Sequence, residues 1–224
     1  MTRNVTVLEA GDAALVARFE ARIDPAVNAR AIRTAEIFRR GAPVGVRDVV
    51  VGYASVTVYF DPLAADPGAL RDAIAHAAAQ AAGAERGAGR VVDIPVRYGG
   101  ADGPDLEEVA AFARCTPEEV VRLHAAPLYR VYMIGFVPGF PYLASVDPRI
   151  AMPRRETPRR LVPAGSVGIA GSQTGIYPTA TPGGWRIIGR TDIVLFDMAE
   201  EPRALLAPGD RVRFVPVEGP TRRP

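Results

Sequence analysis

The sequence contains no lysine, so all 27 of its basic residues are arginines. This absence excludes a phosphate-binding P-loop lysine, a Schiff-base lysine and a lysine-linked cofactor in this chain. Against 25 acidic residues the formal charge is only +2, which is too weak to indicate bulk binding to nucleic acid or to a membrane surface. We therefore expect neither as a partner.

Thiols, imidazoles and long apolar runs are also scarce. The single cysteine, Cys115, excludes an internal disulfide and a cysteine-rich metal site. The two histidines, His76 and His124, cannot form a three-histidine zinc site by themselves, so we expect no metal. No apolar run approaches the ~18 residues of a transmembrane helix, and the N-terminus lacks the apolar core of a signal peptide. These absences predict a soluble, cytoplasmic protein.

Residues 1–85 alternate strand patterns with helix patterns. Two β-rich runs precede each of two helix patterns, at residues 25–40 and 67–82, and each helix pattern begins with an Asp-Pro pair. This order predicts a small α+β sandwich with both helices on one face of the sheet. The polar, glycine-rich residues 83–90 that follow are the predicted linker.

Residues 90–224 have a different pattern. A predicted strand at residues 91–98 contains Pro95, which places it at a sheet edge or a bulge. Two short helices, at residues 105–113 and 116–126, are followed by many short strands separated by Gly and Pro. Such a pattern predicts a closed or sandwiched β structure, so the fold class is α+β with a separate C-terminal β domain.

The second of these short helices carries a start signal and a candidate catalytic residue. Thr116 is the predicted N-cap, with Pro117 at the first helical position and Glu119 at the third, which is a capping box. His124 falls at the C-terminal end, where the helix dipole favours the protonated imidazole. His124 could act as a general acid or base near neutral pH. The alternative is a structural histidine.

The segment GFVPGFPYL at residues 135–143 is rich in rings. Five of the sixteen aromatic residues fall within residues 129–142. Gly and Pro exclude a helix here, so Phe136 and Phe140 are expected on an irregular loop that displays flat apolar faces. Such a loop either forms a pocket wall or plugs one end of a barrel.

A glycine-rich segment at residues 163–178 supplies uncharged donors and acceptors. Ser166, Gln173 and Tyr177 suit the recognition of an amide or a carboxylate, and the glycines allow close approach to a ligand or turns with positive φ. The segment matches neither the dinucleotide-binding nor the P-loop pattern. The alternatives are a buried amide for Gln173 and a core ring for Tyr177.

A third segment, TPGGWRIIGRT at residues 181–191, contains the only tryptophan, Trp185, and ends its strand with Arg190. A functional Arg190 would clamp a carboxylate with its planar fork, whereas a structural Arg190 would bind carbonyl groups or an acid. We expect Arg190 to converge with Gln173 and Tyr177 on one ligand.

Upstream of these segments, residues 149–160 hold five arginines and one glutamate. Such a charge run is usually a solvated surface, which is the interpretation for Arg155 and Arg160. Arg154 and Arg159 each follow a proline, which fixes the local backbone and makes them better site candidates.

Taken in order, the segments GFVPGFPYL, VPAGSVGIAGSQTGIYP and TPGGWRIIGRT resemble the allophanate hydrolase subunit 1 family, over about residues 124–196. That family includes a 5-oxoprolinase subunit (PxpB) and the sporulation kinase inhibitor KipI. The resemblance implies a cyclophilin-like β-barrel behind the α+β domain. It also implies a hetero-oligomer with a subunit 2-type (PxpC-like) protein. A PxpA-like protein would complete the ATP-dependent opening of 5-oxoproline, a cyclic amide, to L-glutamate.

On this basis we expect a 5-oxoprolinase subunit. Its assigned catalytic residues are His124, Gln173 and Arg190. The assigned substrate-binding residues are Phe136, Phe140, Arg154, Arg159, Ser166, Tyr177 and Trp185. ATP requires cations at its phosphates, and this chain offers only arginine, so we expect ATP with Mg at a site shared with or held by a partner. The chain should then be inactive by itself. Two alternatives remain: a KipI-like inhibitor of a histidine kinase, and the carboxyltransferase subunit of a urea-carboxylase-type enzyme.

Overall fold

The computed structural model describes residues 5–41, 43–82 and 89–219 of the 224-residue chain. The chain divides into two compact units, Met1–Ala88 and Gly89–Pro224. Most of the predicted linker, residues 83–88, lies outside the described residues. Within the described ranges, no helix combines the length and the apolar character needed to span a bilayer.

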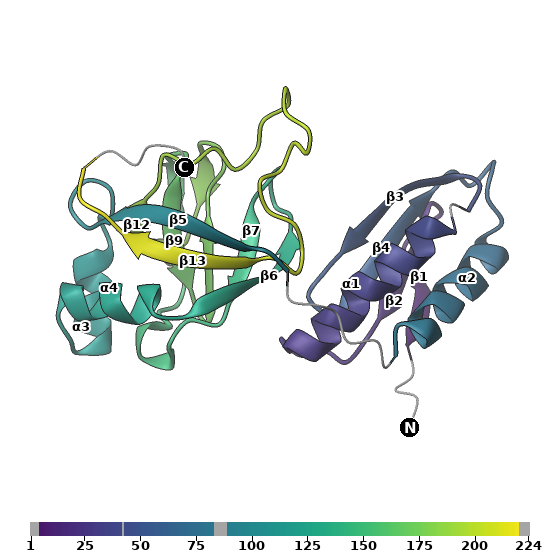
Figure 1. Ribbon diagram of the computed structural model, residues 1–224, viewed down its shortest axis with the longest axis horizontal. Coiled ribbons are helices and arrows are strands. Elements are labelled where there is room, and N and C mark those ends of the chain that lie inside the picture. The colour runs from purple at the N-terminus through teal and green to yellow at the C-terminus, as the bar shows by residue number, and fades with distance from the viewer. Residues whose placement is uncertain (1–4, 42, 83–88, 220–224) are drawn as a thin grey trace. The chain divides into compact units, whose positions relative to one another are not determined.

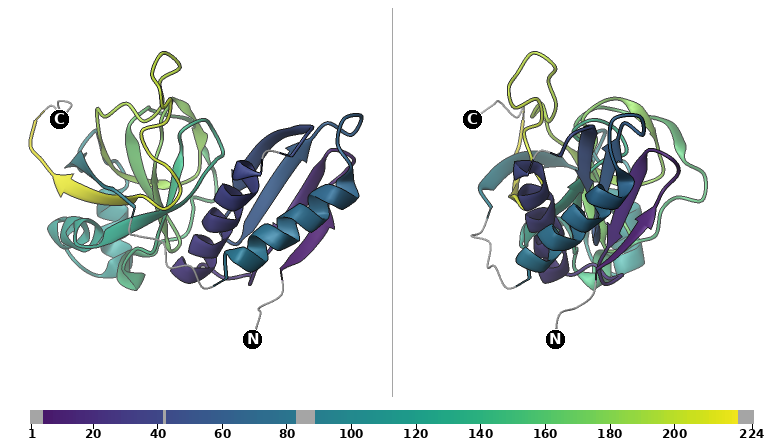
Figure 2. Two further views of the ribbon diagram at one scale, coloured as in Figure 1. Left: turned by 45° about the vertical axis from the view of Figure 1, so that its right-hand side comes forward. Right: turned by 90° about the vertical axis from the view of Figure 1, so that its right-hand side faces the viewer.

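The N-terminal unit is a four-stranded antiparallel sheet with two helices on one face (Figures 1 and 2). The sheet has the order β1-β2-β4-β3 and consists of β1 (Thr6–Glu9), β2 (Ala14–Arg18), β3 (Val46–Val51) and β4 (Ser55–Phe60). The helices are α1 (Pro25–Arg40) and α2 (Pro67–Gln80). The predicted α+β sandwich is therefore confirmed.

Local signals account for these elements. The Asp24 side chain accepts hydrogen bonds from the amides of Ala26 and Val27, and Asp66 accepts one from Gly68, so both Asp-Pro pairs cap a helix as predicted. Along β4, alternate side chains face the helices and are buried, which forms the core of this unit.

The C-terminal unit is a closed seven-stranded barrel with the order β10-β7-β6-β13-β5-β12-β9 (Figure 1). Its strands are β5 (Val91–Tyr98), β6 (Leu128–Ile134), β7 (Pro141–Ala144), β9 (Ser166–Ala170), β10 (Gln173–Ile176), β12 (Arg186–Arg190) and β13 (Arg211–Pro216). Outside the barrel, β8 (Arg159–Val162) pairs with β11 (Thr181–Gly183). The helices are α3 (Leu106–Ala113), α4 (Pro117–Ala125) and the 3₁₀ helix η1 (Pro148–Ile150).

Although the barrel is closed, one side of β5 is a free strand edge at Pro95, as predicted. β13 pairs with β5 in parallel along its whole length, whereas β12 pairs only with Arg97 and Tyr98. Pro95 has no backbone N–H, and it lies where one side of β5 has no partner strand.

The barrel wall separates two apolar cores. Val167 and Ile169 of β9 point into the barrel interior, where they pack with residues of α3 and α4. Ala170 lies on the opposite side of β9 and belongs to a second core on the outside of the wall. The residues of this outer core are Phe140, Val162, Ala170, Tyr177, Trp185 and Ile187.

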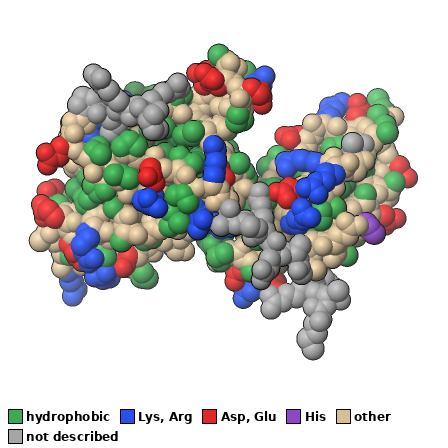
Figure 3. Space-filling model, in the orientation of Figure 1, with side chains coloured by type: hydrophobic (Ala, Val, Ile, Leu, Met, Phe, Trp, Pro, Cys, Tyr) green, Lys and Arg blue, Asp and Glu red, His purple; other side chains and the backbone are tan. Residues whose placement is uncertain are grey.

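Charge is spread over the surface of the barrel unit. Figure 3 shows acidic and basic side chains interspersed with apolar ones on the visible face. This distribution matches the nearly balanced totals of 27 basic and 25 acidic residues.

Candidate functional site

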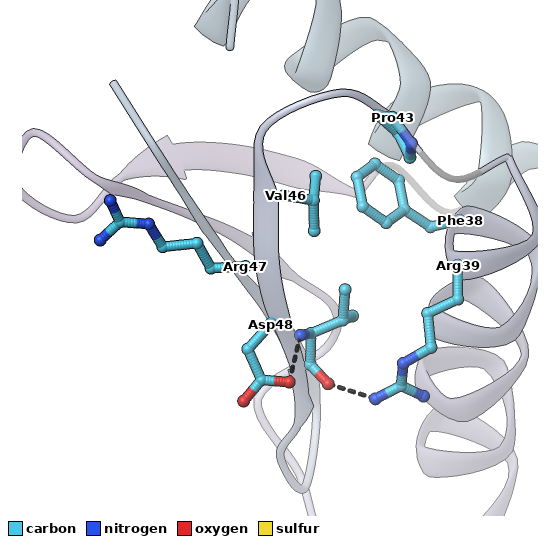
Figure 4. Close-up of a pocket in the computed structure, with 7 residues that line it drawn as sticks. Phe38, Arg39, Pro43, Val46, Arg47 and Asp48 are labelled. Carbon is cyan, nitrogen blue, oxygen red and sulfur yellow. Dashed lines mark hydrogen bonds between the residues drawn. The ribbon is translucent and has the colours of Figure 1, made fainter. Parts of the chain in front are cut away.

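A pocket of about 290 Å³ lies in the N-terminal unit beside β3 (Figure 4). Its lining residues are Phe38, Arg39, Pro43, Val46, Arg47, Asp48 and Val49. The Arg39 guanidinium donates to the Val49 carbonyl, and Arg47 extends away from Phe38 and pairs with Asp61 at 2.8 Å. Both cations are thus held by structural partners. The ten site residues predicted from the sequence all lie in the other unit.

The strongest concentration of predicted site residues is on the outside of the barrel wall. The Phe140 ring lies at the centre, and its centroid is 4.9 Å from that of Tyr142, 5.2 Å from Tyr177, 5.3 Å from Trp185 and 5.6 Å from Phe136. Most of these pairs meet edge to face, the arrangement that aromatic rings prefer. We call these five residues the aromatic cluster. The GFVPGFPYL loop therefore covers the outer wall and does not plug the barrel end.

The glycines of the neighbouring segments make room for these rings. A Cβ atom on Gly175 would lie 3.0 Å from both the Phe140 and the Trp185 rings, and a Cβ on Gly183 would overlap the Tyr177 hydroxyl. Close approach was predicted for a ligand, and at these positions it is made instead by the chain's own aromatic side chains. Gly165 and Gly171 serve the other predicted purpose, since they turn with φ of +79° and +57°.

Phe136 differs from the rest of the aromatic cluster because its side chain is 59% exposed. Its backbone has a φ of +69°, a conformation that costs a non-glycine residue about 1–3 kcal/mol. An exposed ring on a strained backbone contributes little to folding. Both features are typical of a residue retained for binding.

Asp105 organises the basic stretch beside the aromatic cluster. Its carboxylate is 3% exposed and accepts two hydrogen bonds from Arg159, at 2.7 and 2.8 Å, and one from Arg155 at 3.3 Å. It also accepts one from the backbone N–H of Ile187 at 2.6 Å. The bond to Asp105 raises the pKa of Arg159. Substrate binding was predicted for Arg159, but its planar fork is already occupied by a structural carboxylate.

Arg154 lies in the same stretch but is exposed, and no hydrogen bond or ion pair joins it to another described residue. Its backbone position is nevertheless well fixed. The Gly171 amide donates to the Met152 carbonyl at 2.8 Å, and the Arg155 amide donates to the Gly184 carbonyl at 2.8 Å. These bonds hold the segment on either side of Arg154 against the turns next to the aromatic cluster.

The Arg154 guanidinium acts electrostatically on two phenols of the aromatic cluster. Burial raises the pKa of Tyr142 and of Tyr177, and the positive charge of Arg154 opposes the rise at both. The Tyr177 oxygen also accepts a hydrogen bond from the Trp185 amide. Tyr177 is 1% exposed, and its hydroxyl packs closely against Gly183.

His124 lies inside the barrel, away from the aromatic cluster. The Thr174 hydroxyl donates its only proton to the Gly168 carbonyl at 2.9 Å, so His124 Nε2 must donate to Thr174 Oγ1 at 2.8 Å. In a neutral ring Nδ1 then accepts from the Tyr98 hydroxyl at 2.8 Å, a donor kept protonated because burial raises its pKa. We call this chain of hydrogen bonds the polar wire.

The expected protonation of His124 is wrong. The side chain is fully buried, and burial lowers its pKa to about 3, because desolvation penalises the charged form more than the helix dipole favours it. Both ring nitrogens already have partners. His124 therefore positions the barrel strands and does not face a ligand.

Arg190 and Gln173 do not converge. Arg190 pairs across from Ser166 and Gln173 across from Ala170, at opposite ends of β9, which at about 3.3 Å per residue places their backbones roughly 13 Å apart. Arg190 donates to the Ala164 carbonyl at 3.0 Å, which is its structural alternative. Ser166 is buried. The predicted Arg190–Gln173–Tyr177 site is thus not formed.

The described residues can also be compared with what a metal site and an ATP phosphate cradle require. No group of three or more His, Cys, Asp or Glu side chains in the described ranges is placed to hold a metal ion. The glycine-rich segment runs as strands β9 and β10, whereas a phosphate cradle is a loop that leads into a helix N-terminus. That segment therefore does not fit ATP.

Sequence reasoning missed three residues of these arrangements. Asp105, Tyr142 and Tyr98 each meet a partner far away in the chain, as in the Asp105–Arg159 pair. Only Tyr142 had a signal, since it ends the ring-rich segment already singled out.

Residues 5–206 match the family described as carboxyltransferase domain, subdomains C and D. The chain belongs to this family. Within it, the chain is 40% identical over 225 residues to the 5-oxoprolinase B subunit of Bacillus subtilis, a match that covers 96% of this chain and 94% of the relative. It is 58% identical over 127 residues to the 5-oxoprolinase B subunit of Escherichia coli O157:H7, covering 57% of this chain and 58% of the relative. The resemblance to a family with a 5-oxoprolinase subunit is thus confirmed.

Among solved structures, the protein TTHA0988 superposes with a TM-score of 0.82 at 42% identity. The match covers 94% of this chain but only 41% of the TTHA0988 chain. This chain therefore spans about two fifths of that longer protein.

Proposed function

We propose that this chain is the B-type subunit of a 5-oxoprolinase, which opens the lactam ring of 5-oxoproline to L-glutamate with ATP. The observation that carries the proposal is the 40% identity to the Bacillus subtilis protein over 96% of the chain. The aromatic cluster supports it, because a ring surface beside an unpaired arginine suits a flat cyclic amide that bears a carboxylate.

The chemistry calls for partner proteins. A lactam carbonyl resists water, and transfer of a phosphoryl group from ATP to its oxygen would activate the ring carbon. The net reaction consumes one ATP and two water molecules and yields glutamate, ADP and phosphate. The chain has no lysine, and its glycine-rich segment forms strands instead of a phosphate cradle. We place ATP and Mg on, or shared with, a PxpC-like or PxpA-like partner.

Reconstitution tests the proposal. The purified chain is mixed with the PxpC-like and PxpA-like proteins of the same organism, and glutamate and ADP are measured with 5-oxoproline present or absent. We expect coupled formation of both products from the three proteins together and none when any one is omitted. Turnover by this chain alone, or none by the full mixture, contradicts the proposal.

The family match favours one alternative, a carboxyltransferase subunit that works with a biotin carboxylase. That activity requires bicarbonate and a biotinylated partner, so avidin would abolish it. A 5-oxoprolinase would be unaffected by avidin. Avidin-insensitive turnover in the reconstituted mixture therefore separates the two functions.

A further inference from the structure

We propose that Arg39 and Asp48 block the free edge of β3 and prevent it from pairing with the same edge of a second copy of this chain. The sheet order β1-β2-β4-β3 gives β3 a partner strand, β4, on one side only. An unpaired edge offers backbone N–H and C=O groups to any other strand. Four of the six residues of β3 are valines, and segments of this kind pair readily with identical ones. The proposal does not depend on the enzymatic reaction.

The register of the sheet shows which backbone groups of β3 face outward. The Gly52 amide donates to the Ser55 carbonyl of β4 at 2.8 Å, so these two residues form a hydrogen-bonded pair of the antiparallel ladder. Such pairs alternate along a strand with pairs that are not hydrogen-bonded. Val49 and Val51 therefore direct their N–H and C=O groups away from β4. An added strand would bind at these two residues.

Both outward groups of Val49 are already occupied by side chains (Figure 4). The Arg39 guanidinium, in the last turn of α1, donates to the Val49 carbonyl. The Asp48 carboxylate accepts from the Val49 amide at 2.7 Å. Arg39 thus replaces the N–H of a neighbouring strand, and Asp48 replaces its C=O. We call these two residues the edge-blocking pair.

The symmetry of a β3–β3 contact explains why occupying Val49 is sufficient. A two-fold axis at Val50 would place Val49 of each copy opposite Val51 of the other. In that register, every hydrogen bond between the two Val49–Val51 segments involves Val49 of one copy or of the other. A bulge at Arg47 interrupts the strand on one side of this segment, which also discourages edge pairing.

Apolar surface beside the edge would favour this contact if the edge-blocking pair were removed. The pocket of about 290 Å³ next to β3 is lined in part by Phe38, Val46 and Val49. Val49 and Val51 are buried on the side of the sheet that the helices cover. Val51 of a second copy would therefore lie beside Val49 and this pocket. The edge-blocking pair thus withholds both hydrogen-bonding groups and apolar contacts.

The test compares two double variants of the full chain that have the same net charge as the wild type. Arg39→Ala/Asp48→Ala removes the edge-blocking pair. The control, Arg40→Ala/Asp72→Ala, removes one cation and one anion from exposed positions on α1 and α2. Sedimentation over a range of concentrations measures the mass of each. We expect the first variant to dimerise about a hundred-fold more tightly than the wild type, because backbone hydrogen bonds are freed. The control should match the wild type.

A cross-link locates the contact. Val50→Cys, in a chain that also carries Cys115→Ser, places a thiol on the proposed two-fold axis. Opposite residues of a pair that is not hydrogen-bonded have Cα atoms about 4.5 Å apart, which is within the range of a disulfide. Under oxidising conditions we expect a disulfide-linked dimer when the edge-blocking pair is removed and little when it is present.

Single variants keep the test decisive if the double variant does not fold, which melting curves reveal. Arg39→Ala frees only the Val49 carbonyl and Asp48→Ala only the Val49 amide, so each should strengthen dimerisation about ten-fold. Asp48→Asn keeps an oxygen that accepts from the amide and should behave as the wild type. Unchanged association of every folded edge-blocking variant overturns the proposal, and so does a dimer that the Val50→Cys thiol does not cross-link.

Discussion

Inside the barrel, every polar atom of the His124 side chain has a partner, whereas on the outer wall Arg154 has none among the described residues. The polar wire ends at Tyr98 on one side and at Thr174 on the other, and both His124 and Thr174 are fully buried. On the outer wall, by contrast, the Arg154 side chain and the Phe136 ring are exposed to solvent. Residue type suggested chemistry in both regions, but only the outer one has groups available to a ligand.

Asp105 with its partners Arg155 and Arg159, which we call the Asp105 clamp, offers the largest expected effect on stability. Asp105→Ala would leave Arg155 and Arg159 without the buried carboxylate that they share. Removing one member of a buried ion pair costs about 3–5 kcal/mol of folding free energy. We expect a decrease of this size in the free energy of unfolding, measured by urea denaturation.

The matched control for this clamp is Glu108→Ala. Glu108 also pairs with an arginine, Arg186, at 2.6 Å, but it is largely exposed. Exposed pairs contribute at most about 1 kcal/mol. Similar decreases in the free energy of unfolding for Asp105→Ala and Glu108→Ala would show that the buried pairs of Asp105 contribute no more than an exposed pair.

The polar wire predicts a pH dependence of stability. The folded-state pKa of His124 is about 3, below the ordinary value of about 6.5 in the unfolded chain. Below pH 6.5 the unfolded state takes up a proton that the folded state does not. His124 therefore lowers the stability by about 1.4 kcal/mol per pH unit between pH 6.5 and 3.

The variant His124→Gln cannot titrate and should lack this component. Between pH 7 and pH 5 the wild type should lose about 2 kcal/mol more than the variant. Urea denaturation at the two pH values measures the difference. If the unfolding free energies of the wild type and the variant changed equally with pH, His124 would titrate alike in the folded and unfolded states, which would contradict a buried, neutral imidazole.

Packing of the aromatic cluster is tested at two adjacent glycines. A methyl group on Gly183 would overlap the Tyr177 hydroxyl, whereas one on Gly184 would have its nearest neighbour at an ordinary 3.6 Å. Gly183→Ala should therefore lower the stability by about 1–3 kcal/mol, as overpacking does, and Gly184→Ala should have little effect. Thermal unfolding of the two variants measures the difference in stability. Equal melting temperatures would contradict the close packing of Gly183 against Tyr177.

Local signals in the sequence were enough to predict the helices and most strands. The Thr116 hydroxyl accepts from the Glu119 amide at 3.3 Å, as the predicted capping box requires. The Glu119 carboxylate, however, binds Arg122. Each of these contacts joins residues only three positions apart, which explains why the pattern was visible in the sequence.

The site was less predictable because its contacts join distant segments. Asp105 and Arg159 are 54 residues apart, and His124 and Thr174 are 50 apart. Such pairs depend on the register of the barrel strands, where a shift of one residue reverses every side chain. The ring-rich loop was recognisable, but the sequence did not show that Arg159 binds Asp105 whereas Arg154 has no hydrogen-bond or ion-pair partner among the described residues.

Phe136 offers the smallest effect on stability and the sharpest contrast within the aromatic cluster. Phe136→Gly removes an exposed ring and relieves a backbone strain of about 1–3 kcal/mol, while glycine adds about 0.5–1 kcal/mol of unfolded-state entropy. The stability should therefore stay level or rise slightly. Phe140→Ala, at the buried centre, should instead lose about 3–5 kcal/mol. Thermal unfolding of both variants measures the contrast. A large loss from Phe136→Gly would mean that its ring supports the fold, and its exposure and strain would then no longer indicate a binding role.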